Sequence, residues 1–78
     1  MSNIEKYNQV FCKTLQVSED QLKDLKYQDV ELWDSVGHMT LMAELEDAFD
    51  IMMETDDIID FSSYEIGIDI LRKYNVDI

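Results

Sequence analysis

The stretch WDSVGHM, residues 33–39, holds the side chains of this sequence that are best placed for chemistry. It brings together the carboxylate of Asp34, the hydroxyl of Ser35, a glycine at position 37 and the only histidine, His38. Three interpretations of Ser35 follow: the nucleophile of a small hydrolase, the cap of a helix, or a residue to which a group is attached. Each makes a different demand on the neighbouring residues.

The hydrolase interpretation is disfavoured by both motif and geometry. The letters SVG supply half of the G-x-S-x-G turn that exposes a nucleophilic serine, but Trp33 stands where the first glycine belongs. A catalytic triad also needs carboxylate, imidazole and hydroxyl in line beside an oxyanion hole. Asp34, Ser35 and His38 lie within about one helical turn, from which side chains point in diverging directions.

The other two interpretations place Ser35 in the first turn of a helix. A serine there is commonly a cap, because its oxygen accepts a hydrogen bond from a free backbone N–H. The same place suits a phosphodiester, because free N–H groups and the helix dipole favour added negative charge. Gly37 would let a modifying enzyme approach closely, although glycine inside a helix costs about 1 kcal/mol relative to alanine. These residues alone leave both interpretations open.

The elements that position these residues are expected to form an all-α bundle of three longer helices and one short one. Capping-box patterns, S-x-x-E/Q, begin at Ser2, Ser18 and Ser62 and mark helix starts. Asp34 is the expected N-cap of the helix that carries Ser35. With the apolar spacing of three and four residues, these signals predict helices over about Asn3–Leu15, from Asp34 or Ser35 to about Phe49, near Thr55, and over about Ser63–Tyr74, with a short helical turn from Ser18 to about Leu25.

The apolar stripes of these helices predict one core, and so one domain over residues 1–78. The expected buried residues are Ile4, Tyr7, Phe11, Leu15, Leu41, Met42, Leu45, Phe49, Ile58, Ile59, Phe61, Tyr64, Ile68 and Leu71. Met39, Met42, Met52 and Met53 are expected mainly to fill irregular gaps in that core. Trp33 is expected to pack the preceding loop onto the bundle, and Gly67 to let another helix, or a group attached to the protein, come close.

The charge of the chain is strongly negative. Its 18 acidic residues face 6 basic ones, for a net charge of −12, and no Lys or Arg occurs between Lys26 and Arg72. Such a surface repels nucleic acids and anionic membranes and attracts proteins with basic patches. The single cysteine, Cys12, excludes an internal disulfide and a zinc cluster. No apolar run approaches the ~20 residues of a membrane helix, and the polar start MSNIEKYNQ is unlike a signal peptide, so the expected compartment is the cytoplasm.

The stretch WDSVGHMTLMAELEDAFDI, residues 33–51, resembles the phosphopantetheine-attachment region of acyl carrier proteins. In that family an Asp-Ser-Leu-type motif opens the second helix, and an apolar pattern, an acidic run and Phe-Asp-Ile or similar follow. Here residues 34–36 correspond to the motif and residues 49–51 to its close, without a gap. The order of helices, the length and the acidity extend the resemblance over nearly the whole chain.

The resemblance implies a carrier that is not itself an enzyme and has no metal site. Ser35, flanked by Asp34 and Val36, would receive 4′-phosphopantetheine from coenzyme A through a separate, magnesium-dependent phosphopantetheinyl transferase, the holo-acyl-carrier-protein synthase. The terminal thiol would hold an acyl group as a thioester for partner enzymes with basic patches, and Met42 would be the best candidate for lining a space that admits the acyl chain. The carrier would act as a monomer. The implied partner-binding residues are Val36, Met39, Ala43, Glu46, Asp47, Asp50, Glu54, Asp56 and Asp57.

The sequence also departs from the family pattern. Gly37 stands where an acid is frequent, Thr40 where a glutamate is frequent, and MMET replaces a proline that commonly precedes the third helix. These departures favour a standalone carrier for a specialised pathway, such as polysaccharide or lipopolysaccharide modification or polyketide synthesis, over a carrier of general fatty acid synthesis. Two alternatives stay open: a carrier of aminoacyl or peptidyl groups, and, from a different class, an unmodified acidic helical adaptor that binds basic proteins.

Overall fold

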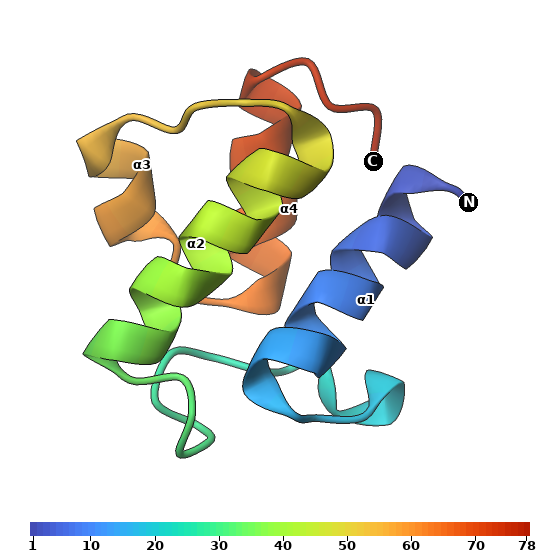
Figure 1. Ribbon diagram of the computed structural model, residues 1–78. Coiled ribbons are helices and arrows are strands. Elements are labelled where there is room, and N and C mark those ends of the chain that lie inside the picture. The colour runs from blue at the N-terminus through green and yellow to red at the C-terminus, as the bar shows by residue number, and fades with distance from the viewer.

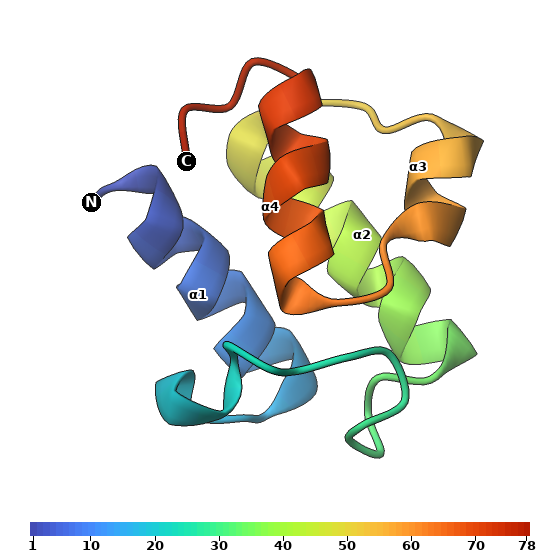
Figure 2. The same cartoon turned by 180° about the vertical axis from the view of Figure 1, so that it is seen from behind.

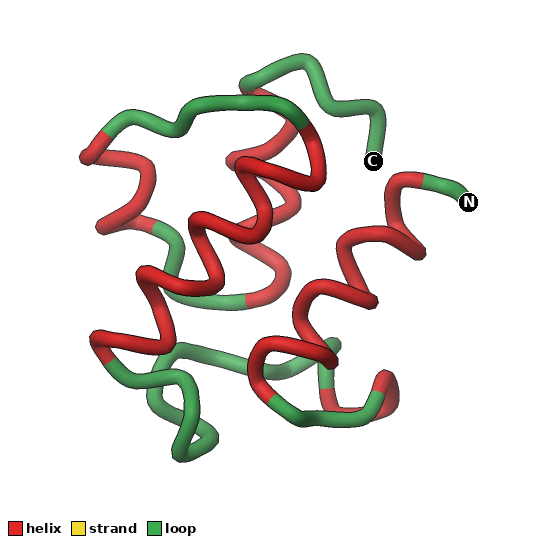
Figure 3. The backbone as a smooth tube through the Cα atoms, in the orientation of Figure 1, coloured by secondary structure: helices red, strands yellow, loops and turns green.

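The computed structural model describes residues 1–78 and consists of helices joined by loops, with no strand (Figures 1 and 3). This confirms the all-α bundle of three longer helices and one short one. The elements in chain order are α1 (Asn3–Leu15), a short 3-10 turn η1 (Glu19–Gln21), α2 (Ser35–Phe49), α3 (Thr55–Asp60) and α4 (Tyr64–Lys73). The helical turn that was expected to reach Leu25 is therefore shorter than predicted.

The helix starts follow the capping signals of the sequence, with one shift. Ser2 and Glu5 form the predicted reciprocal box, in which Glu5 N–H donates to Ser2 Oγ at 3.3 Å and Ser2 N–H donates to Glu5 Oε1 at 3.0 Å. At α4 the cap is Ser63 rather than Ser62, because Ile66 N–H donates to Ser63 Oγ at 3.0 Å. Either of the two adjacent serines could cap a helix that begins one residue later. The S-x-x-E pattern indicates Ser62, and this prediction is wrong by one residue.

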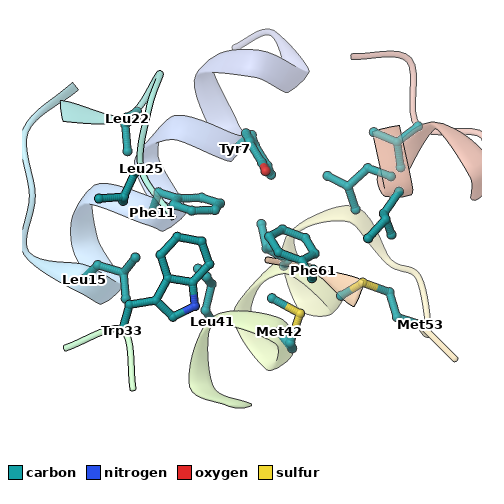
Figure 4. Close-up of a cluster of buried hydrophobic side chains, with 14 residues drawn as sticks. Tyr7, Phe11, Leu15, Leu22, Leu25, Trp33, Leu41, Met42, Met53 and Phe61 are labelled. Atoms are coloured by element: carbon teal, nitrogen blue, oxygen red, sulfur yellow. The ribbon is translucent and has the colours of Figure 1, made fainter. Parts of the chain in front are cut away.

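The helices surround a core that is rich in aromatic side chains (Figure 4). The ring of Phe11, from α1, contacts those of Tyr7, Trp33, Phe61 and Tyr64 at centroid distances of 4.8, 5.5, 6.2 and 5.4 Å. Trp33 is fully buried, which confirms that it packs the loop before α2 onto the bundle. Aromatic pairs at such distances contribute beyond their buried area, so the position of this loop is well determined.

Gly67 allows α4 to pack closely against this aromatic cluster. A Cβ at this position would lie 2.2 Å from both the Phe61 ring and the Tyr7 hydroxyl. The Tyr7 hydroxyl donates to the backbone carbonyl of Tyr64 at 2.7 Å and so ties α1 to the start of α4. The expectation of a close approach at Gly67 is confirmed.

Several side chains expected in the core lie at the surface instead. Ile4 is 38% exposed and Ile59 71% exposed, and of the four methionines only Met42 and Met53 are buried. Consecutive residues of a helix point about 100° apart. A six-residue helix such as α3 therefore cannot direct Ile58, Ile59 and Asp57 into one core, and it is Ile59 that faces outward. In α4 the buried pair is Ile70 and Leu71, with Tyr64 and Ile68 half-buried.

The short helix α3 stands beside α2 on the side away from α1 (Figures 1 and 2) and is held to α4 by polar contacts. The buried carboxylate of Asp57 accepts hydrogen bonds from the Lys73 ammonium and the Tyr74 hydroxyl. The Tyr74 oxygen in turn accepts the N–H of Glu54 at 2.8 Å. The hydrogen bond from Lys73, together with that from Tyr74, holds the pKa of the Asp57 carboxyl below its usual range, against the opposing effect of burial.

We predict that the contribution of Asp57 to stability is lost in acid. Because folding lowers this pKa, the contribution is fully present above the unfolded value of 3.8 and disappears as the pH falls through the lower folded value. The difference in free energy of unfolding between the wild type and Asp57→Asn should therefore be largest near neutral pH and shrink below pH 3.8. Urea denaturation followed by circular dichroism measures it. The exposed neighbour Asp56 provides the control, and an equal pH dependence for Asp56→Asn would contradict the assignment.

Candidate functional site at the start of α2

Asp34 caps α2, as the sequence predicts, and this defines the role left to Ser35. The Asp34 Oδ1 atom accepts the N–H of Gly37 at 2.8 Å, and its backbone oxygen accepts the N–H of His38 at 2.7 Å. Ser35 is the first helical residue, and its hydroxyl accepts no backbone N–H. The N–H groups of Ser35 and Val36 make no hydrogen bond within the chain. The interpretation of Ser35 as a helix cap is therefore wrong, because its neighbour performs that function.

The hydroxyl of Ser35 contacts one side chain, that of Tyr27. The two oxygens are 3.2 Å apart and either could donate the hydrogen. Ser35 is exposed and Tyr27 half-buried. Sequence reasoning missed Tyr27 because it lies in the irregular segment KYQDVEL, where no periodic pattern indicates which side chains face the helix.

The imidazole of His38 is held between two other groups and does not reach Ser35. The indole Nε1–H of the buried Trp33 donates to His38 Nδ1 at 2.9 Å, so Nδ1 is an acceptor. The hydrogen of the neutral ring is then on Nε2, which donates to the carbonyl of Ile58 at 2.8 Å. The Trp33 and His38 rings are nearly coplanar, with an interplanar angle of 15°, as an in-plane hydrogen bond between their edges requires. His38 thus joins the loop before α2 to α3, and both of its nitrogens are occupied.

These contacts leave no Asp-His-Ser relay at the start of α2. The Asp34 carboxylate is used by Gly37 N–H, and His38 by Trp33 and Ile58. No hydrogen bond joins His38 to Ser35. The three residues that suggest a triad in the sequence therefore point to three different partners.

A mostly apolar pocket opens beside the Ser35 hydroxyl, between α2 and α3. Its volume is about 350 Å³, and no charged side chain lines it. The lining residues are Tyr27, Ser35, His38, Met39, Ile58, Ile59 and Ser62. Met42 does not line this pocket; it is buried in the core, as its place in the apolar stripe of α2 predicts. The exposed hydroxyl, free N–H groups and adjoining apolar pocket suit a negatively charged ester at Ser35 that continues into a longer, partly apolar group.

Gly37 is required by the protein's own loop. A Cβ at position 37 would lie 1.7 Å from the carbonyl oxygen of Leu32 and 3.3 Å from Asp34 Oδ1. The loop therefore crosses the first turn of α2 at a distance that only glycine allows. This is a different reason for the glycine from the one that the sequence suggests.

The residues expected to meet partners are mostly at the surface. Val36 and Met39 are 76% and 55% exposed, and the exposed set also contains Ala43, Asp47, Asp50, Glu54 and Asp56. Glu46 is half-buried, because its Oε2 accepts the N–H of Met53 at 2.8 Å. Asp57 is buried and bonded to Lys73 and Tyr74, so it is not available at the surface and its expected place among the partner-facing acids is corrected.

Comparisons with protein-family models, curated proteins and solved structures found no match for this chain. None of its helices combines the length and the apolar character needed to cross a lipid bilayer. The class of protein that this site defines is therefore inferred from its residues and their geometry.

We predict that Gly37→Ala destabilises the protein, although alanine is the better helix former. Helix propensity alone would give a gain of about 1 kcal/mol. The contact with the Leu32 carbonyl reverses the sign, because a backbone group must move, and the expected loss is about 1–3 kcal/mol. Urea denaturation measures it, with Val36→Ala as the exposed control one residue away. A stabilised Gly37→Ala variant would contradict the close approach of the loop.

We also predict that His38→Leu weakens the connection between the loop, α2 and α3. The substitution removes the acceptor of the buried Trp33 N–H and the donor to the Ile58 carbonyl. An unsatisfied buried group costs about 1–3 kcal/mol. The free energy of unfolding should fall by at least that amount, and the indole N–H proton resonance of Trp33 should move upfield. The exposed Thr40→Ala is the control. An indole resonance unchanged in His38→Leu would show that the bond is absent.

Proposed function

We propose that this protein is an acyl carrier protein, modified with 4′-phosphopantetheine on Ser35. One observation carries the proposal: Asp34 provides the cap of α2, which leaves the neighbouring Ser35 hydroxyl exposed in the first turn, beside an apolar pocket. A serine kept only as a cap would use its oxygen as Asp34 does. The resemblance of residues 33–51 to the attachment region of carriers supports the same assignment.

The start of α2 fits the charge of the phosphodiester. The free N–H groups of Ser35 and Val36 lie at the positive end of the helix dipole. In the transfer, the Ser35 oxygen would form a bond to the β-phosphorus of coenzyme A, the pyrophosphate P–O bond would break with adenosine 3′,5′-bisphosphate as the leaving group, and the serine proton would pass to a base of the transferase. The thiol of the attached arm would supply thioester chemistry, while this chain presents the arm.

The surface around Ser35 supports a protein that meets several partners in turn. Val36 and Met39 expose apolar side chains on α2, and the acidic residues that follow are free of basic neighbours in sequence from Tyr27 to Leu71. Charge complementarity raises encounter rates with basic partners without requiring tight binding. Candidate partners are the phosphopantetheinyl transferase and the enzymes that load and transfer acyl groups. These enzymes would belong to fatty acid synthesis, polyketide synthesis, or the modification of lipids and polysaccharides, and the carrier would meet them in the cytoplasm.

We predict that Ser35 is the only position that accepts the arm. Incubated with coenzyme A, magnesium and a broad-specificity phosphopantetheinyl transferase, the wild type should gain the mass of one phosphopantetheinyl group, and Ser35→Ala should gain none. Because Asp34 retains the cap, Ser35→Ala should change the free energy of unfolding by no more than about 0.5 kcal/mol. Intact mass, peptide mapping and circular dichroism measure these outcomes.

Ser62→Ala is the matched control, because Ser62 is an exposed serine that lines the same pocket. It should be modified like the wild type. A wild type that gains nothing with several transferases would overturn the carrier proposal and leave an acidic helical adaptor as the better one. Once modification is established, trial loading with fatty acyl, small acyl and aminoacyl groups separates an acyl carrier from an aminoacyl or peptidyl carrier.

A further inference from the structure

The side chain of Tyr27 is the one polar group that the fold directs at the Ser35 oxygen. Its hydroxyl lies 3.2 Å from Ser35 Oγ, although the two residues belong to different segments of the chain. The other side-chain donors that line the pocket are Ser62, which has no bond to Ser35, and His38, whose Nε2–H is used by the Ile58 carbonyl. Tyr27 is therefore the side chain best placed to contact whatever is attached to Ser35.

The position of Tyr27 is fixed by contacts that do not depend on Ser35. Its backbone N–H donates to the Ser62 carbonyl at 2.9 Å, next to an isolated antiparallel bridge between Lys26 and Ser63. Its ring packs edge-on against Trp33 and His38, at centroid distances of 6.2 and 5.4 Å. The hydroxyl will therefore stay at this place when the chemistry of its serine partner changes.

Modification of Ser35 would change what Tyr27 can bind. As a phosphoester, the Ser35 oxygen carries no hydrogen and is a weak acceptor, whereas the non-bridging oxygens attached to the same phosphorus carry the negative charge. A hydrogen bond from a hydroxyl to a charged oxygen is shorter and stronger than one between neutral groups. No cationic side chain lines the pocket to compete for that charge.

We propose that Tyr27 is the phosphate-binding residue of the modified protein: its hydroxyl, which bonds Ser35 Oγ before modification, donates to a non-bridging phosphodiester oxygen afterwards. This inference rests on the proposed function. It adds a contact that limits the directions in which the arm can leave α2, because the tyrosine holds the phosphate in addition to the serine ester and the free N–H groups of the first helical turn. The arm then starts at the mouth of the pocket between α2 and α3.

Phosphorus-31 NMR of the modified protein tests this contact, because the phosphodiester gives a single resonance. Tyr27→Phe removes the hydroxyl and keeps the ring that packs on Trp33 and His38. We expect the wild-type resonance to be displaced from its position in the urea-unfolded protein, Tyr27→Phe to lose most of that displacement, and Ser62→Ala to keep it. An unchanged resonance in Tyr27→Phe, or an equal loss in Ser62→Ala, would overturn the inference.

A second measurement needs no variant. The carbon-13 resonance of Tyr27 Cζ reports the hydrogen bonding of its hydroxyl and should shift when the wild type is modified, as the partner changes from a neutral oxygen to an anion. A Cζ resonance that stays in place while the Ser35 Cβ resonance moves would overturn the inference and leave the carrier function intact. If intact mass shows no modification of the wild type, the proposed function itself fails, so the two failures are distinguishable.

Discussion

The hydrogen bond from the Trp33 indole to His38 is the constraint on which the geometry around Ser35 depends. It is made by a fully buried side chain, so the N–H has no alternative partner in solvent. Because it makes Nδ1 an acceptor, it also determines that Nε2 donates, and this donor reaches the carbonyl of Ile58. One bond thus fixes the loop before α2 and one wall of the pocket. Tyr27, packed against both rings, takes its position from the same pair.

Besides its hydrogen bond from His38, α3 is attached to the bundle by an electrostatic contact through Asp57. Asp57 faces Lys73 and Tyr74, which end α4 and begin the C-terminal segment. A helix of six residues cannot be stable on its own, so α3 takes its place from these polar contacts and from His38. The pocket beside Ser35 is accordingly bounded by an element held through side-chain hydrogen bonds rather than through a large apolar interface.

The sequence predicts the helices and the cap at Asp34 because these features are local. Apolar spacing and capping chemistry involve residues three or four positions apart, and α1, α2 and α3 begin where those signals place them. The position of Ser35 in the first turn of α2 could therefore be predicted, and so could the burial of Trp33. The exposed Ile59 and the shift from Ser62 to Ser63 are errors of one residue, in segments too short for periodicity to fix the register.

The parts of the site that the sequence does not reveal depend on tertiary contacts. Nothing in KYQDVEL indicates that Tyr27 reaches Ser35, or that the Leu32 carbonyl excludes a Cβ at position 37. His38 reads as a candidate member of a triad with Asp34 and Ser35, yet its ring is used to connect the loop and α3. Asp57 reads as one more acid in an acidic run, and only the folded chain brings Lys73 to it. In each case the partner lies on another segment of the chain, and no local pattern determines how two segments meet.

The contact between Trp33 and His38 has a practical consequence, because the chain contains one tryptophan and one histidine. The intrinsic fluorescence of the protein originates chiefly from an indole that is hydrogen-bonded to the imidazole and lies two residues before Ser35. No labelling is needed to observe this region, and no other indole contributes a background. The molecule therefore carries its own optical reporter at the candidate site, whose emission should respond to events at the start of α2 while remaining insensitive to changes at the distant chain ends.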